Sequence, residues 1–305
     1  MKRLLEQYFP VMRKYPSRLG NWMKRRLFHT SRHSCRELNV VNCVVRAPVP
    51  DVAGLKILFL SDLHWYESRR NLRMLETLER IAAEITPDYL VLGGDIVEDA
   101  DRICELPAAL TRLSRLAPVA LAVPGNWENG KRWLKPEFWN KLYADCGITL
   151  LRNEAFRSGA IRFHGIDDIS SGDCELPEKR DPALVKPGSA PIAEVLVAHS
   201  PDTIIALDSG LDLQSYDVAL CGHCHGGQVR LPFFGALYCP SRYGRRFLRG
   251  AFKRRNSHLK MLVSAGAGER RGSFRLNCPR EVLLLTFRPA HHYRFRGLRT
   301  GSHRE

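Results

Sequence analysis

Seven side chains of the types that bind metal ions stand where short apolar runs of the sequence end. They are Asp62, His64, Asp95, Asn126, His199, His223 and His225. In α/β proteins, sites form where the carboxyl ends of strands converge, because the loops there are free to project side chains into a common space. A single Asp or His at such an end is more often a helix cap or an ordinary hydrogen-bonded residue. Five run ends that carry such residues instead predict one shared site.

A mixture of carboxylates and imidazoles suits Mn²⁺, Fe²⁺ or Zn²⁺ better than Ca²⁺. Seven ligands are too many for one ion that keeps open positions, but they suit two ions about 3.5–4 Å apart that share a bridging carboxylate. The sequence therefore predicts two divalent metal ions, with Mn²⁺ as the expected metal and Fe²⁺ or Zn²⁺ as alternatives.

The apolar runs that lead into these residues are short and rich in Val, Ile and Leu, which is typical of buried strands. They cover residues 55–60, 89–92, 119–123, 161–164, 195–198, 218–220, 260–263 and 282–286. Helical patterns cover residues 72–85, 103–116 and 136–147. Strands that first alternate with helices and then follow one another closely predict an α/β sandwich covered by helices. Residues 171–191 are predicted to form a long loop.

The charge of the chain is concentrated at its two ends. The 305 residues carry a formal net charge of +15, from 47 basic and 32 acidic side chains. Nine Lys or Arg and the single acid Glu6 lie between Met1 and Ser34, and sixteen basic residues and three acids lie between Arg245 and Glu305. Such a balance favours a polyanionic partner, which charge alone leaves open among nucleic acid, anionic membrane and phosphorylated substrate.

Residues 1–35 have the pattern of basic amphipathic helices with aromatic residues on the apolar side, as in helices that lie on a membrane surface. Packing of the same apolar residues onto the domain is an equal alternative. We therefore predict an N-terminal segment at 1–50 that can anchor the chain to a membrane surface, one domain at 51–290 and a basic tail at 291–305. No apolar run reaches the eighteen residues of a membrane span.

The N-terminus lacks the continuous apolar core of a signal peptide, because Arg13, Lys14 and Arg18 interrupt it. Nine cysteines without regular spacing favour reduced thiols. We expect a cytoplasmic protein that associates peripherally with the inner face of the cell membrane.

The motif series resembles the calcineurin-like metallophosphoesterase superfamily over residues 55–287. Its parts are Asp62-x-His64, Gly94-Asp95, Gly125-Asn126, His199 and Gly222-His223-x-His225-Gly226-Gly227-Gln228. The resemblance implies a four-layer α/β/β/α sandwich with a dinuclear metal site at the carboxyl ends of the strands. By position, the first metal would be bound by Asp62, His64 and His225, and the second by Asn126, His199 and His223.

The same resemblance makes Asp95 the bridging ligand and Asp95, Asn126 and His199 the catalytic residues. Cys221 and Cys224 are then neighbours of the ligands rather than a redox pair. Weaker candidates for substrate contact are Trp127, Glu128 and Arg230.

One position departs from the family pattern. The family usually has His after Gly-Asn as the proton donor to the leaving oxygen, and this chain has Trp127, followed by Glu128. Tryptophan has no acidic proton to give. An alkoxide leaving group benefits greatly from a general acid, whereas a phosphate, whose last pKa is about 6, departs without one. The substitution favours a pyrophosphate or another activated substrate, unless Glu128 or His164 supplies the proton.

The segment from Gly226 to Pro232, followed by Ser241-Arg242-Tyr243-Gly244, resembles the membrane-associated branch of the superfamily. Within the superfamily, hydrolases of UDP-2,3-diacylglucosamine in lipid A synthesis also lack this His. The leading hypothesis is therefore hydrolysis of a phosphoanhydride in a nucleotide-linked or phosphorylated lipid. A general phosphodiesterase or phosphatase is the alternative, and a catalytically inactive membrane scaffold is less favoured. No nucleic acid partner is expected, since no basic groove studded with aromatic residues is evident.

An apolar segment follows the last ligand motif and has two possible roles. Its residues are Phe233, Phe234, Leu237 and Tyr238. It suits either a hairpin packed on the sheet, which is slightly favoured, or a lid over acyl chains.

Overall fold

The computed structural model describes residues 38–98, 100–130, 134–175, 192–208, 213, 216–253, 259–269 and 274–289. The predicted helices at 1–35, most of the predicted loop at 171–191 and the tail at 291–305 lie outside the described residues.

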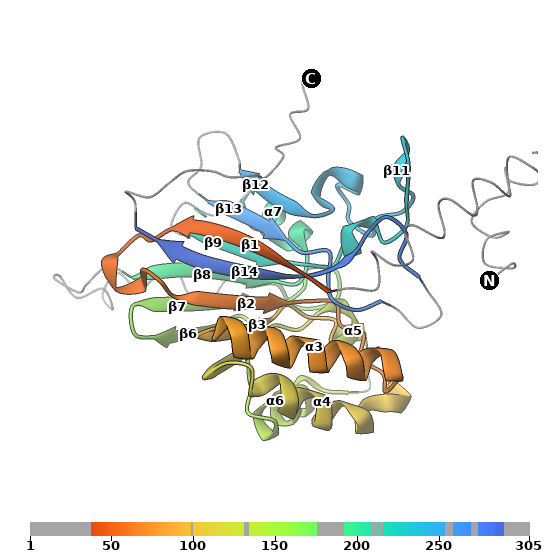
Figure 1. Cartoon of the computed structure of the whole chain (residues 1–305), viewed down its shortest axis with the longest axis horizontal. Coiled ribbons are helices and arrows are strands. Elements are labelled where there is room, and N and C mark those ends of the chain that lie inside the picture. The colour runs from red at the N-terminus through yellow and green to blue at the C-terminus, as the bar shows by residue number, and fades with distance from the viewer. Residues whose placement is uncertain are drawn as a thin grey trace, which may run out of the picture.

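Two six-stranded sheets stack face to face in this part of the chain (Figure 1). The first sheet has, in order across it, β1 (Leu38–Arg46), β14 (Arg280–Arg288), β2 (Lys56–Leu60), β3 (Tyr89–Leu92), β4 (Val119–Ala122) and β5 (Thr149–Leu150). The second has β12 (Gly250–Lys253), β13 (Lys260–Val263), β9 (Val218–Cys221), β8 (Ala193–Ala198), β7 (Ile161–Ile166) and β6 (Glu154–Ser158). The strands β2 to β5 are mutually parallel, as are β7, β8, β9 and β13.

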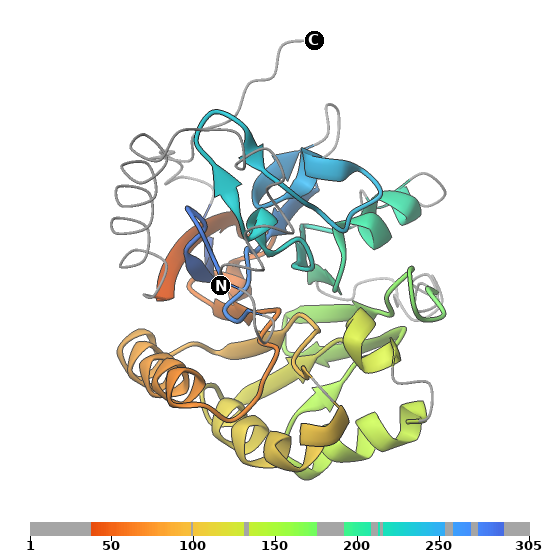
Figure 2. The same ribbon diagram turned by 90° about the vertical axis from the view of Figure 1, so that its right-hand side faces the viewer.

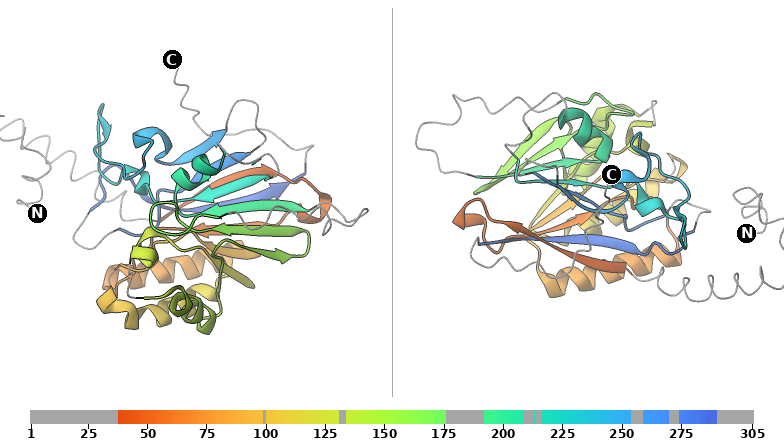
Figure 3. Two further views of the ribbon diagram at one scale, coloured as in Figure 1. Left: turned by 180° about the vertical axis from the view of Figure 1, so that it is seen from behind. Right: turned by 90° about the horizontal axis from the view of Figure 1, so that it is seen from above.

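Helices cover the outer faces of both sheets. Those on the first sheet are α3 (Arg69–Ile85), α4 (Leu106–Ser114) and α6 (Pro136–Asp145), which form the lower layer in Figures 1 and 2. The helix α7 (Pro201–Asp208) packs on the outer face of the second sheet, as the view from behind shows (Figure 3). The layers therefore run α/β/β/α, and the predicted sandwich is confirmed.

Burial on both faces explains why the strands read as continuous apolar runs. In β2, Ile57 and Phe59 are fully buried in the core between the two sheets. Their neighbours Leu58 and Leu60 are equally buried against the helices of the first sheet. A central strand such as β2 thus contributes to two cores, and Ser61 and Asp62 follow it at its carboxyl end.

The three helical patterns are confirmed, with small shifts at their ends. Ser68 caps α3, since its hydroxyl accepts the backbone N–H of Asn71 at 3.2 Å. The pattern at 103–116 divides into a 3₁₀ helix (Ala100–Glu105) and α4, which has a proline in its first turn. Pro136 begins α6, as predicted.

Two segments differ from the expectation. The strand β1 lies within residues 1–50, yet it pairs with β14 over its whole length. Its polar residues Asn39 and Asn42 interrupt the apolar pattern, because this edge strand is buried mainly through Cys43 and Val45. The segment after the last ligand motif is indeed a hairpin, of β10 (Arg230–Leu231) and β11 (Gly235–Ala236), but its aromatic side chains are exposed instead of packed on the sheet.

Within the described residues, no helix is long and apolar enough to cross a membrane.

Candidate metal centre

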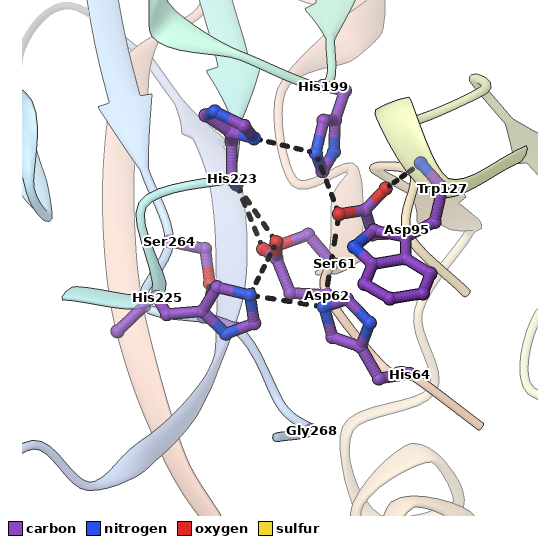
Figure 4. Close-up of polar contacts among 12 residues, drawn as sticks. Ser61, Asp62, His64, Asp95, Trp127, His199, His223, His225, Ser264 and Gly268 are labelled. Carbon is purple, nitrogen blue, oxygen red and sulfur yellow. Dashed lines mark hydrogen bonds and ion pairs between the residues drawn. The ribbon is translucent and has the colours of Figure 1, made fainter. Parts of the chain in front are cut away.

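The seven predicted ligands gather at one edge of the sandwich, where parallel strands of both sheets end. Figure 4 shows these ligands, apart from Asn126, which is not labelled there. The first sheet contributes the residues that follow β2, β3 and β4, and the second sheet those that follow β8 and β9. The fold therefore brings together side chains that are up to 163 positions apart, from Asp62 to His225.

The donor atoms form two groups of three. Asp62, His64 and His225 make one group, and Asp95, His199 and His223 make the other, with ligand atoms in each group within 4.8 Å of one another. The Asn126 side chain joins the second group, with its Oδ1 3.1 Å from His199 Nε2. One Asp95 oxygen, Oδ2, lies 3.2 Å from His199 Nε2 and 3.8 Å from His64 Nε2, so it stands between the two groups.

Buried neighbours orient these side chains. His199 Nδ1 lies 2.8 Å from the carbonyl oxygen of Gly93, which accepts its proton and directs Nε2 into the site. His64 Nδ1 lies 3.0 Å from the Glu98 carboxylate. The Asp62 carboxylate accepts the Ser61 hydroxyl at 2.7 Å and the backbone N–H of His223 at 3.0 Å. Such partners hold a ligand in position before a metal arrives.

Backbone conformation is unusual at the ligands themselves. Five of the seven have left-handed φ values, which are uncommon for residues other than glycine: Asp62 (54°), His64 (46°), Asp95 (53°), His223 (70°) and His225 (48°). Conformations of this kind cluster at functional sites, where the surrounding structure maintains the strain. The motif glycines assist by allowing close approach. A Cβ at Gly222 would lie 2.4 Å from Asp62 Oδ2.

Comparison with known proteins agrees with this geometry. Residues 55–227 match the family model described as calcineurin-like phosphoesterase. The chain belongs to this family. It is 30% identical to the phosphodiesterase YaeI of Escherichia coli over 243 residues, which is 77% of this chain and 83% of that protein. It is 28% identical to the metallophosphoesterase YkuE of Bacillus subtilis, over 77% of this chain and 79% of that one.

Among solved structures, a dimetal phosphatase of Danio rerio is 11% identical, with a TM-score of 0.44 over 70% of this chain and 88% of that one. Family membership makes this metallophosphoesterase a metal-dependent phosphoester hydrolase.

The donor atoms of the metallophosphoesterase fit two divalent cations. A metal–nitrogen bond of about 2.1 Å places two adjacent ligands of one ion about 3 Å apart. The two imidazole pairs have this spacing, since His64 Nε2 and His225 Nε2 are 3.1 Å apart, as are His199 Nε2 and His223 Nδ1. The carboxylates of Asp62 and Asp95 are almost fully buried, and a divalent cation held by each group would compensate their charge.

Burial and charged neighbours shift the pKa values of three of the histidines. Burial and the neighbouring His64 hold the pKa of His225 well below its usual value, and burial and His199 lower the pKa of His223. Burial also opposes the charged form of His199, but the Asp95 carboxylate outweighs it and raises the pKa of His199 well above its usual value. In the same way, His199 and His64 overcome the effect of burial on Asp95 and lower its pKa. A divalent cation at the second group would require the neutral form of His199.

Glu128 has a structural position that the sequence did not reveal. Its carboxylate is fully buried and accepts four backbone N–H groups, those of Gly125 (2.9 Å), Asp95 (3.0 Å), Ile96 (2.8 Å) and Val97 (3.2 Å). Both oxygens are thus committed to the loops that carry Asp95 and Asn126. The expectation that Glu128 contacts substrate or donates a proton does not agree with this placement.

Trp127 stands directly at the metal centre. Its backbone N–H donates to Asp95 Oδ1 at 2.8 Å, and its indole meets the His64 ring edge to face, with centroids 5.5 Å apart (Figure 4). Arg230, the third weak candidate for substrate contact, donates to the carbonyl oxygen of Gly226 at 3.0 Å. Its guanidinium therefore braces the loop that carries His225.

His164 is not part of the centre. It is buried, and its Nε2 lies 2.6 Å from the Glu194 carboxylate. Glu194 is five residues before His199 along β8, which corresponds to roughly 16 Å of strand. His164 itself pairs with Leu196, three residues before His199, and its ring faces Glu194, which lies farther from the ligands.

The sequence interpretation missed a sixth strand end. The strand β7 continues to Ile166 and is followed by Asp167 and Asp168, both buried. Asp168 affects the pKa values of His199 and His223, and Asp167 accepts the Asn129 amide at 2.6 Å and also pairs with Arg152. The signal is a pair of adjacent carboxylates after an apolar run, but the strand predicted at 161–164 ends two residues before the observed end at Ile166.

Proposed function

We propose that this metallophosphoesterase hydrolyses phosphoanhydrides and activated phosphodiesters whose leaving group needs no protonation. The observation that carries the proposal is the placement of Trp127 beside His64, at the position where the family pattern has a histidine. The two other candidate donors face elsewhere, since Glu128 is bound to backbone amides and His164 to Glu194. A leaving group with a low pKa departs without such help.

Within this proposal, Asp95 would bridge the two metals, because one of its oxygens lies near both histidine groups. Asp62, His64 and His225 would hold the first ion, and Asn126, His199 and His223 would hold the second. Bound divalent ions would polarise the phosphoryl oxygens and activate water. The chain itself supplies the fixed geometry, through the Glu98, Gly93 and Glu128 contacts that keep the ligands in place.

The substrate that we propose is a nucleotide-linked lipid, with UDP-2,3-diacylglucosamine of lipid A synthesis as the compound to test first. Its pyrophosphate meets the leaving-group requirement, and its acyl chains place it at a membrane surface. The proposed location is the cytoplasmic face of the cell membrane, with residues 1–35 as a basic anchor, and the proposed metal is Mn²⁺.

The direct test is to incubate the purified full chain and Mn²⁺ with UDP-2,3-diacylglucosamine and to measure release of UMP. UMP formation that requires the metal and is lost in Asp95→Ala would support the proposal. Hydrolysis of bis(p-nitrophenyl) phosphate without any UMP release would reject this substrate and leave the leaving-group argument standing.

A second candidate is a phosphodiesterase that acts on other phospholipids or on soluble phosphodiesters. The similarity to a protein named phosphodiesterase favours it. Comparison of glycerophosphodiesters with UDP-linked lipids under the same metal conditions separates the two candidates, because only the second candidate predicts cleavage of an unactivated alkyl ester.

A further inference from the structure

The hairpin that follows the metal ligands exposes a cluster of large apolar side chains. Phe233 is 105% exposed, Phe234 73%, Tyr238 71% and Leu237 42%. Among the described residues, the only other large apolar side chains that are this exposed are Val44 and Tyr243, and Tyr243 lies five residues after Tyr238. Exposed aromatic residues grouped in this way mark an interaction surface more often than isolated ones do. We refer to residues 230–238 as the aromatic hairpin.

The aromatic hairpin is held firmly at its base, so its exposure does not reflect loose packing. Arg245 Nη1 donates to the carbonyl oxygens of Phe234 at 2.8 Å and Ala236 at 3.1 Å. Ala236 itself is buried against the ligand loop, where a Cβ at Gly227 would lie 2.3 Å from its own Cβ. The tip therefore projects from a fixed base, as the upright β11 in Figure 1 illustrates.

Phe233, at the turn of the hairpin, has an unfavourable backbone conformation. Phe233 has a φ of 67°, in the left-handed region that favours glycine, and its side chain packs against none of the described residues. A bulky residue in this conformation costs of the order of 1–3 kcal/mol, and no packing in the described part of the chain offsets that cost. An aromatic residue at this position is therefore better explained by contact with a binding partner than by a contribution to the stability of the fold.

The sequence in and after the hairpin is basic. Between Val229 and Lys253 the sequence has six basic residues and no acid, and the basic residues are Arg230, Arg242, Arg245, Arg246, Arg249 and Lys253. Arg242, Arg245 and Arg246 are exposed. Aromatic side chains that enter the region between lipid headgroups and acyl chains, next to arginines that contact lipid phosphates, are the combination that binds proteins to anionic membranes.

We propose that the aromatic hairpin is a membrane-docking element that inserts its tip into the headgroup region of an anionic lipid bilayer. Arg242 and Arg246 would then lie over the lipid phosphates. A second copy of the chain is a poor occupant, because a two-fold interface would bring the same positive surfaces together. Since β10 begins five residues after His225, docking would hold the metal centre at the edge of the bilayer.

The inference rests on the membrane part of the proposed function and is independent of its chemistry. It is tested with the full chain and vesicles of phosphatidylglycerol and phosphatidylcholine, by co-sedimentation at several salt concentrations. Phe233→Ser combined with Phe234→Ser should reduce the partition coefficient about tenfold or more, from the apolar burial of two aromatic rings. Arg242→Glu combined with Arg246→Glu should reduce it similarly, and mainly at low salt, because each basic residue near the surface contributes about 1 kcal/mol.

Matched controls are Val44→Thr, which makes an exposed apolar side chain polar outside the hairpin, and Lys141→Glu, which reverses an exposed charge on α6. Neither should change vesicle binding. Hydrolysis of bis(p-nitrophenyl) phosphate should be the same in all four variants, which reports on the fold and the metal centre separately from docking.

Unchanged vesicle binding in both hairpin variants would overturn the inference, as would failure of the full chain to bind vesicles. A concentration-dependent dimer that the Phe233→Ser/Phe234→Ser variant abolishes would overturn it in favour of a second copy. If the folded native chain with metal did not hydrolyse bis(p-nitrophenyl) phosphate, that result would count against the proposed function and not against the docking inference.

Discussion

The Glu128 carboxylate accepts the backbone N–H of Asp95, the proposed bridging ligand, at 3.0 Å. The same oxygen accepts the N–H of Gly125, and the other accepts those of Ile96 and Val97. One side chain thus fixes the loops after β3 and β4 relative to each other. The precision of the metal centre depends on this link, since ligand groups must be held within a fraction of an ångström.

Glu128→Gln should destabilise the protein and weaken the contacts that hold the loops carrying Asp95 and Asn126 in place. The amide places an NH₂ group against two backbone donors, and each lost hydrogen bond to a charged acceptor is worth about 1.5–3 kcal/mol. We expect the free energy of unfolding to fall by about 3–6 kcal/mol, measured by chemical denaturation. The control is Glu79→Gln, which breaks a half-exposed pair with Arg112 and should cost less than about 1 kcal/mol. Equal effects of the two substitutions would contradict the role given to Glu128.

Asp95→Ala should abolish hydrolysis and reduce metal content at both groups, because its Oδ2 lies between them. His223→Ala should instead empty mainly the second group and leave about one ion per chain. Metal content measured by mass spectrometry separates the two outcomes. A near-normal rate with two metals per chain in Asp95→Ala would reject the bridging assignment.

The ligand positions were predictable because each polar ligand interrupts an apolar pattern. A strand that is buried on both faces is mostly apolar, so an Asp or His that directly follows it stands out, as at Asp62 and His199. The parallel order of the strands then brings these ends to one edge. The same reasoning does not predict strand β1, because this edge strand is half exposed and carries polar residues within its length.

Supporting residues were less predictable, because their role depends on partners that are distant in sequence. Glu128 looks like an ordinary acid beside a site, and only the fold turns its carboxylate toward the amides of residues 95–97. Arg275 is similar. Its buried guanidinium donates to the carbonyl oxygens of Ala265, Gly266 and Gly268, which line the loop beside Asp62. No local pattern distinguishes such an arginine from a surface one.

Cys239 should react as a thiolate near neutral pH. A hydrogen bond with the Cys224 thiol and the backbone N–H of Ser241 lower the pKa of Cys239 to about 7, although burial opposes this. Because the pKa is lowered, the reactive thiolate accumulates as pH rises through 7. Alkylation by iodoacetamide, followed on the Cys239 peptide by mass spectrometry, should show a midpoint near 7. Cys224→Ala should move it upward, toward about 8.5, and an unchanged midpoint would contradict the pairing of the two thiols.

Trp127→His tests whether the enzyme works without a general acid. In the native chain, the rate should depend steeply on the pKa of the leaving group, so that pyrophosphates and aryl esters react much faster than alkyl esters. An imidazole at this position could protonate a leaving alkoxide, which is worth about 10²–10⁴-fold, while a pyrophosphate should gain little. The variant should therefore raise the alkyl-ester rate and flatten the leaving-group dependence, as measured with a series of phosphodiesters. Trp127→Phe is the control, because it keeps an aromatic ring beside His64 and adds no titratable group. Equal native rates on alkyl and pyrophosphate substrates would refute the argument and would mean that another group already supplies the proton.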